Sequence, residues 1–210
     1  MLPGPIYIYE CPNCGNLLQK FSFISGNTFG AKMYSDGKCI APMLPKRLIL
    51  TKCKKCNNIF WLNKLKEIGT VEFDDYKNPM RKNADLIESL KIDGCFKAID
   101  TGIAENEQEE FFIRQLIWRL YNDRVRKGEN QFIGVDDEIM WRENCYKLIS
   151  LLDSADLDQR IMIAELKRNS GDFDGCLEIL KTIDDNRLNW IKEELIHECK
   201  IKNKNVIKLD

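Results

Sequence analysis

The chain contains one histidine, His197, and no hydrophobic run long enough to span a bilayer. It also offers no evident nucleophile–base pair and no open set of three metal ligands, so we assign no catalytic or cofactor-binding residue. The first nine residues lack the basic and apolar segments of a signal peptide. These absences favour a cytoplasmic protein without a membrane-spanning segment, and a lone histidine such as His197 is usually not a metal ligand.

Acidic residues are scarce near the N-terminus. Residues 1–66 contain only Glu10 and Asp36 against 10 Lys/Arg, a formal +8, whereas residues 67–210 carry a formal −9. Four thiolates holding one Zn²⁺ would lower the first figure to about +6. The asymmetry has two interpretations: a basic surface for an anionic partner, or two oppositely charged halves that dock on each other.

Nine cysteines occur in a chain that is 44% hydrophobic and 31% charged, a composition typical of a folded protein. In a reducing cytoplasm we expect metal ligands or buried thiols, not disulfides. Four of them fall on predicted helices or helix ends and are interpreted as core residues: Cys95, Cys145, Cys176 and Cys199. Cys39 is either a free or buried thiol or a fifth thiol near a metal.

Two C-x-x-C pairs, Cys11/Cys14 and Cys53/Cys56, are separated by 38 residues. Four thiolates delivered by two tight turns are what a tetrahedral structural Zn²⁺ requires. Gly15 and Asn57 follow the pairs, and both residue types tolerate the left-handed backbone conformation that such a turn needs. The pattern predicts a metal site at these four cysteines. Redox chemistry at one pair is the alternative, but that motif normally precedes a helix in a βαβ unit.

The sequence changes character after Gly69. We predict an α+β protein in which residues 1–69 form a β-rich zinc ribbon with a long insert, 70–82 a connector, and 83–210 an all-α array of helical hairpins. The predicted strands are residues 6–9, 17–24, 31–34, 47–51 and 59–62. The predicted helices are residues 84–91, 107–127, 137–152, 158–170, 173–183 and 187–202.

One segment of the helical part resembles the middle of a tetratricopeptide repeat (TPR). A helix there ends at Gly171, an aromatic follows at Phe173, and a small residue comes at Cys176. The glycine permits the turn, the aromatic packs between the helices, and the small residue allows their close approach. We expect a TPR-like hairpin or an ordinary αα-hairpin, both of which stack antiparallel helices.

The insert between the cysteine pairs has an unusual sequence, with a Gly-rich loop at 25–31 and an Asp36-Gly37 turn signal. The loop is suited either to presenting N–H groups to an anion or to forming tight turns within an elaborated ribbon. It lacks the spacing of a P-loop.

Basic residues cluster around the second cysteine pair and are interrupted by Phe60 and Trp61. They are Lys46, Arg47, Lys52, Lys54, Lys55, Lys64 and Lys66. Phosphates pair with such cations and bases stack on exposed rings, so the pattern is compatible with nucleic acid. Residues 59–62 are equally what a small ribbon needs to bury. In the long helix, Arg119 and Asp123 have the i, i+4 spacing of a surface ion pair within the polar-aromatic stretch 114–126.

Together, the motifs of the first 62 residues resemble a group of uncharacterised bacterial zinc-ribbon proteins that carry a TPR-like helical C-terminal region. The motifs are Cys11-Pro-x-Cys14-Gly, 25–31, 35–37, 42–45, Cys53-x-x-Cys56 and 60–62. The resemblance implies the same two-part architecture and no particular activity.

The pattern favours a non-enzymatic scaffold or protein-interaction protein, in which structural Zn²⁺ holds the ribbon and the helices offer a face to a protein partner. The first alternative is a nucleic-acid-associated protein that uses the basic ribbon face. The second is an enzyme of unknown class with a site between the 25–38 insert and the helices, using Asp36, Ser25 or Arg114.

Overall fold

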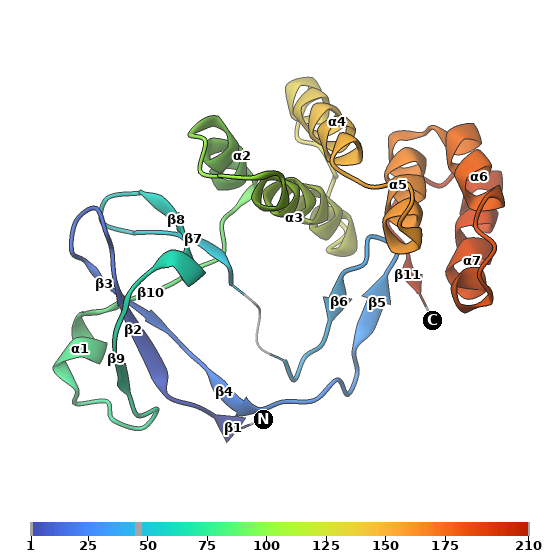
Figure 1. The fold of residues 1–210 in the computed structure, drawn as a ribbon. Coiled ribbons are helices and arrows are strands. Elements are labelled where there is room, and N and C mark those ends of the chain that lie inside the picture. Colours follow the sequence, from blue (N-terminus) through green and yellow to red (C-terminus); the bar gives the residue numbers. More distant parts are fainter. Residues whose placement is uncertain (1, 45–47, 210) are drawn as a thin grey trace. The chain divides into compact units, whose positions relative to one another are not determined.

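The computed structural model describes residues 2–44 and 48–209 and shows an α+β protein (Figure 1). The chain divides into two compact units. The strand unit comprises Met1–Ala31 and Ala41–Ile103, and the helical unit comprises Lys32–Ile40 and Ala104–Asp210. The helical unit therefore takes a short piece of chain from the segment between the two cysteine pairs.

The strand unit is built from short strands, two α-helices and one short 3-10 helix among its described residues. Its strands are β1 (Leu2–Pro3), β2 (Ile6–Glu10), β3 (Leu17–Lys20), β4 (Phe23–Ser25), β7 (Leu50–Lys52), β8 (Ile59–Trp61), β9 (Glu67–Val71) and β10 (Asp85–Leu86). Its helices are η1 (Leu62–Lys64), α1 (Pro79–Asn83) and α2 (Ile92–Asp100). The largest sheet has the order β10-β3-β2-β9, while β7 pairs with β8 and β1 with β4. Period-two alternation places Ile6 and Ile8 of β2 in a core with Val71 and Ala84.

The helical unit contains five α-helices, one short 3-10 helix and a three-stranded sheet among its described residues. The elements are α3 (Glu107–Arg126), α4 (Val135–Ser150), α5 (Leu157–Ser170), α6 (Phe173–Lys181), η2 (Asn186–Leu188), α7 (Asn189–Lys200), β5 (Lys32–Tyr34), β6 (Cys39–Ile40) and β11 (Lys208–Leu209). The sheet has the order β11-β5-β6, so the C-terminal strand pairs with the hairpin taken from the insert. Asn106 caps α3 by accepting from the Glu109 N–H at 3.0 Å.

The α5–α6 hairpin has the turn that the sequence predicts. Gly171 ends α5 with φ +86°, and α6 starts at Phe173. Cys176 is fully buried between the helices, in a core with Ala164, Leu180 and Leu195. A small side chain at this position allows the two helices to approach closely.

Most predicted helices beyond residue 106 are confirmed within a few residues. The helix expected at 84–91 is wrong, because β10 pairs there with β3 in parallel and the Ile87 N–H donates to the Gln19 carbonyl at 3.1 Å. Helix α2 was not expected. The helical unit is also not all-α, because β5, β6 and β11 belong to it. The domain boundaries predicted at residues 69 and 83 differ from the boundary between the two compact units, because residues up to Ile103 belong to the strand unit.

No helix in the described ranges combines the length and the apolar character needed to cross a membrane.

Candidate metal centre

The two cysteine pairs sit in equivalent turns. The first joins β2 to β3 and the second joins β7 to β8. In the first turn the Gly15 N–H donates to the Cys11 carbonyl, and the Cys11 N–H to the Asn16 carbonyl, both at 2.9 Å. Asn57 and Cys53 repeat these bonds in the second turn at the same distances, with Asn58 as the acceptor for Cys53.

The residue after each pair has the positive φ that closes such a turn. Gly15 has φ +67° and Asn57 has φ +57°. Glycine adopts this conformation without steric cost, and asparagine is among the few other residues that adopt it readily. The local sequence therefore favours both turns.

The four Sγ atoms converge. All lie within 4.8 Å of one another, and the Cys11–Cys56 and Cys14–Cys53 pairs are each 3.7 Å apart. Four thiolates at about 2.3 Å from a tetrahedral Zn²⁺ would be separated by about 3.8 Å. The donor set and its spacing therefore fit a tetrahedral ion that prefers thiolate.

The four sulfurs differ in environment. Burial raises the pKa of Cys11 to about 12, whereas hydrogen bonds from the Asn13 side chain and the Asn58 N–H lower the pKa of Cys56 to about 6. Cys56 also borders a pocket of about 360 Å³ that Lys97 and Thr101 help to line. The hydrogen bonds to Cys56 thus favour its thiolate form, which is the form in which cysteine binds a metal ion.

The sulfurs are part of the local core. Cys11 and Cys53 are buried with Leu18, Phe60 and Leu62, and Cys14 and Cys56 pack against that cluster. An ion at this position would therefore connect both turns to the apolar interior of the strand unit.

The basic stretch around Cys53 carries no exposed ring at Phe60 or Trp61, because both are buried. The Trp61 indole N–H donates to the Ile103 carbonyl at 3.0 Å, and Lys54 pairs with Glu88 at 2.8 Å. Lys46 and Arg47 lie outside the described residues. Leu62 is buried as well and Ile59 is half-buried, which agrees with the expectation that residues 59–62 supply apolar core.

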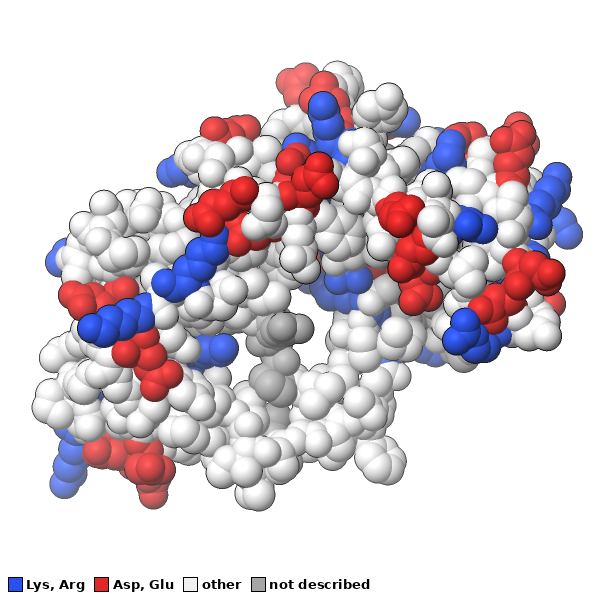
Figure 2. Space-filling model, in the orientation of Figure 1, with Lys and Arg blue, Asp and Glu red and all other residues white. Residues whose placement is uncertain are grey.

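Charge is also more balanced than the sequence halves suggest. The strand unit has 13 Lys/Arg and 9 Asp/Glu, a formal +4, because residues 67–103 bring acids to it. The helical unit carries 19 Lys/Arg and 24 Asp/Glu, a formal −5. On the face drawn in Figure 2, residues of the two signs are interspersed.

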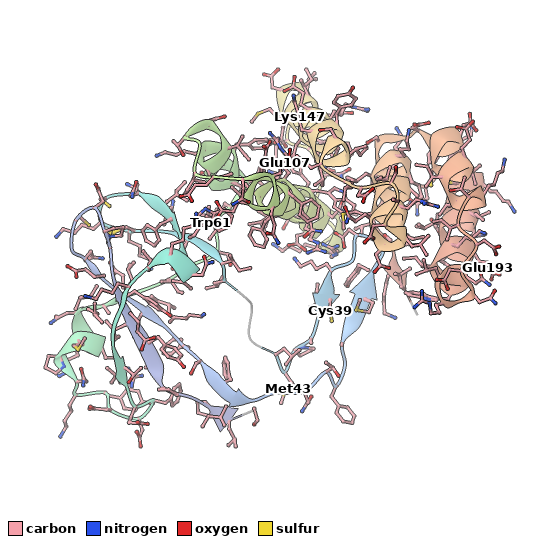
Figure 3. The ribbon with its side chains drawn as sticks, viewed as in Figure 1. Cys39, Met43, Trp61, Glu107, Lys147 and Glu193 are labelled. Carbon is pink, nitrogen blue, oxygen red and sulfur yellow. The ribbon has the colours of Figure 1, made fainter. Side chains whose placement is uncertain are left out.

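The other cysteines and His197 are not members of this cluster among the described residues. Cys95, Cys145, Cys176 and Cys199 are buried, which confirms their interpretation as core residues. Cys39 is an exposed free thiol on β6 of the helical unit (Figure 3). His197 is exposed on α7.

The residues named for an enzyme are not collected in one unit. Ser25 is exposed on β4 of the strand unit, while Asp36 and Arg114 belong to the helical unit. Arg114 donates to Glu110 at 2.7 Å. Asp36 is buried and forms an ion pair with Arg126.

The polar stretch of α3 is not the surface that its spacing suggests. Trp118, Tyr121 and Asn122 are fully buried. Asp123 forms ion pairs with Lys38 and Arg126, and Arg119 donates through Nε to the Asp36 carbonyl at 3.2 Å. The expected Arg119–Asp123 surface pair is therefore replaced by contacts to residues 36–38. No local signal in the sequence links these segments, which lie more than 80 positions apart.

No family model, curated protein or solved structure matches this chain.

Proposed function

We propose that the protein is a zinc-stabilised, non-enzymatic scaffold that binds a protein partner. The observation that carries the proposal is the convergence of four cysteine Sγ atoms within 4.8 Å. Thiolate ligands favour Zn²⁺ over the oxygen-preferring Mg²⁺ and Ca²⁺. Four protein thiolates also complete a tetrahedral shell, which leaves no position for a substrate and makes the ion structural.

Two further features support the architectural part of the proposal. The β2–β3 and β7–β8 hairpins, each turning at a cysteine pair, suit a zinc ribbon. The α5–α6 hairpin, with Gly171 at its turn and Cys176 at the helix contact, suits a TPR-like unit. Arrays of such hairpins commonly present surfaces to protein partners.

Metal analysis of the purified chain tests the proposal. We expect one zinc per chain in the natural protein and in Cys39→Ser, which changes a cysteine outside the cluster. We expect loss of zinc in Cys53→Ser, which removes one of the four ligands. A natural chain that takes up no zinc after reconstitution, or a Cys53→Ser chain that retains it at unchanged affinity, would contradict the proposal.

A further inference from the structure

The β5–β6 hairpin of the helical unit is held by its tip. Ser35 and Asp36 are buried, whereas Met33 is 42% exposed and Ile40 38% exposed. An element that served the apolar core would bury its apolar side chains and expose its polar ones. In this hairpin the distribution is reversed. It is attached through the polar residues of its turn, as a ligand is attached to a receptor.

Asp36 is bound by one face of α3. The Asn122 Nδ2 donates to Asp36 Oδ2 at 3.0 Å, and Arg126 forms an ion pair with the same carboxylate. Arg119 donates to the Asp36 backbone carbonyl at 3.2 Å. Positions 119, 122 and 126 are spaced i, i+3 and i+7, so they lie on one side of the helix.

Ser35 is bound by α5 and by Ile207, the residue before β11. Its Oγ donates to Glu165 Oε1 at 2.6 Å, and the Ile207 N–H donates to the same Oγ at 3.1 Å. The Ser35 N–H donates to the Ile207 carbonyl at 3.0 Å, next to the β5–β11 pairing. Glu165 is in turn held by Arg168, at 2.7 Å, and by Asn169, at 3.0 Å.

The last two residues of the turn also meet specific groups. Gly37 has φ +70°, and a Cβ added there would lie 3.2 Å from Arg119 Nη2. Lys38 forms an ion pair with Asp123. Ser35, Asp36 and Lys38 are thus each bound by groups of the helical unit, and Arg119 limits the space beside Gly37.

Buried charged contacts of this kind add little net stability, because desolvation offsets most of the attraction, but they discriminate strongly between correct and incorrect partners. Pairing with β11 adds the backbone hydrogen bonds of strand addition, a recurring mode of peptide recognition. The resident turn also leaves Arg126 Nε buried without a hydrogen-bond partner among the described residues.

We infer that the helical unit carries a recognition site for a protein β-turn of the type Ser-Asp-Gly-Lys, occupied in this structure by the chain's own hairpin. The site takes an aspartate directly before the glycine that ends the turn, followed by a cation. The inference deepens the proposed function, since it names the class of protein partner, and it does not depend on the identity of the metal.

The resident hairpin competes with any partner. A segment tethered by short flexible linkers acts at an effective concentration of about 1 mM, so the natural chain is expected to bind an external turn weakly. Weakening the resident turn should open the site, whereas weakening the receptor should not.

The test uses a fluorescent peptide of residues 31–42 and full-length chains. Asp36→Asn removes the resident charge and keeps the receptor. We expect it to bind the peptide about 10- to 100-fold more tightly than the natural chain, which is the effect of one charged hydrogen bond. Arg126→Gln weakens both the resident turn and the receptor, so we expect no gain in binding.

A second peptide, with asparagine in place of its aspartate, serves as the specificity control and should not bind. Gly37→Ala, which strains the resident turn at its positive φ, replaces Asp36→Asn if that variant does not fold. Equal binding of both peptides, or no gain over the natural chain in a folded resident-turn variant, would overturn the inference. Zinc content is measured in every sample, so a zinc-loaded chain without peptide binding rejects the receptor and leaves the scaffold proposal intact.

Discussion

The strand unit and the helical unit are stabilised by different means. The core around the four cysteines has six buried members, of which two are the candidate ligands Cys11 and Cys53. The C-terminal core of the helical unit has nine buried members. Trp118, Tyr121 and Trp141 of the same unit are also buried. A small core built partly from candidate metal ligands is expected to depend on a bound ion, whereas a larger apolar core stabilises its fold without one.

Removal of the metal should produce the largest difference in stability between the two units. Structural zinc contributes on the order of 10 kcal/mol to the folding of small metal domains. We therefore expect a strong chelator to abolish amide hydrogen-exchange protection in β2, β3, β7 and β8 and to leave α5–α7 protected. Exchange followed by mass spectrometry measures both regions in one sample.

Cys53→Ser should reproduce the effect of the chelator, and Cys39→Ser should not. If protection in the strand unit survives chelation, or if both units lose it together, the contrast between them is wrong.

The buried carboxylate of the helical unit should give the next largest effect. Glu165→Ala leaves the fully buried Arg168 guanidinium without its counter-ion, which typically costs about 3–5 kcal/mol. We expect a clear loss of denaturant stability in the helical unit with unchanged zinc content. Glu193→Ala, at an exposed site on α7 (Figure 3), is the control. Equal stability of the two variants would show that the buried pair is dispensable.

A smaller effect is expected at the α5–α6 turn. Gly171→Ala places a side chain at φ +86°, which costs about 1–2 kcal/mol. Gly134→Ala is the matched control, because Gly134 has an extended φ of 178° and an added Cβ would meet no atom within 4 Å. Thermal unfolding of the two variants should differ by several degrees, and identical midpoints would contradict the prediction.

The smallest effect should come from Asp172, the N-cap of α6. Its carboxylate accepts from the Gly175 N–H at 2.9 Å, and the hydrogen bond from Lys167 lowers its pKa. Because the folded pKa lies below the unfolded value, the stabilisation is complete above about pH 4 and fades as the pH falls through the lowered pKa. Asp172→Ala should cost about 1 kcal/mol at pH 7.

Thermal unfolding between pH 7 and pH 3 measures this dependence. The difference in unfolding midpoint between the natural chain and Asp172→Ala should become smaller towards pH 3. A difference that does not change with pH would show that the effect does not arise from ionisation of Asp172.

Sequence reasoning found the candidate metal centre because its determinants are local. The spacing within each cysteine pair and the residues at positions 15 and 57 fix the turns, and only the approach of the two turns needs the fold. Helix α2 was missed because Gly94 resembles a helix end, yet it lies in the first turn, where an added Cβ would contact Leu90 at 3.4 Å.

The site for the β-turn could not be predicted in the same way. Asn122 and Arg126 have the composition of a solvated helix face, and Asp36 that of a surface turn. The site becomes visible only because these side chains are buried against each other. Contacts between residues so far apart in the sequence arise from the tertiary structure and leave no local pattern. For the same reason the propensity of residues 84–91 for helix was overridden by pairing of Asp85 and Leu86 with β3.

The origin of the hairpin in the segment between the cysteine pairs has a consequence for biosynthesis. Residues 32–40 leave the ribosome before the helices α3 and α5 that bind them, and before their strand partner β11. At the usual rates of translation the hairpin waits roughly 10–30 s for its complete site. During that interval the two cysteine turns on either side of it are already synthesised, so the first half of the chain can acquire its metal before the helical unit closes on the Ser35–Lys38 turn.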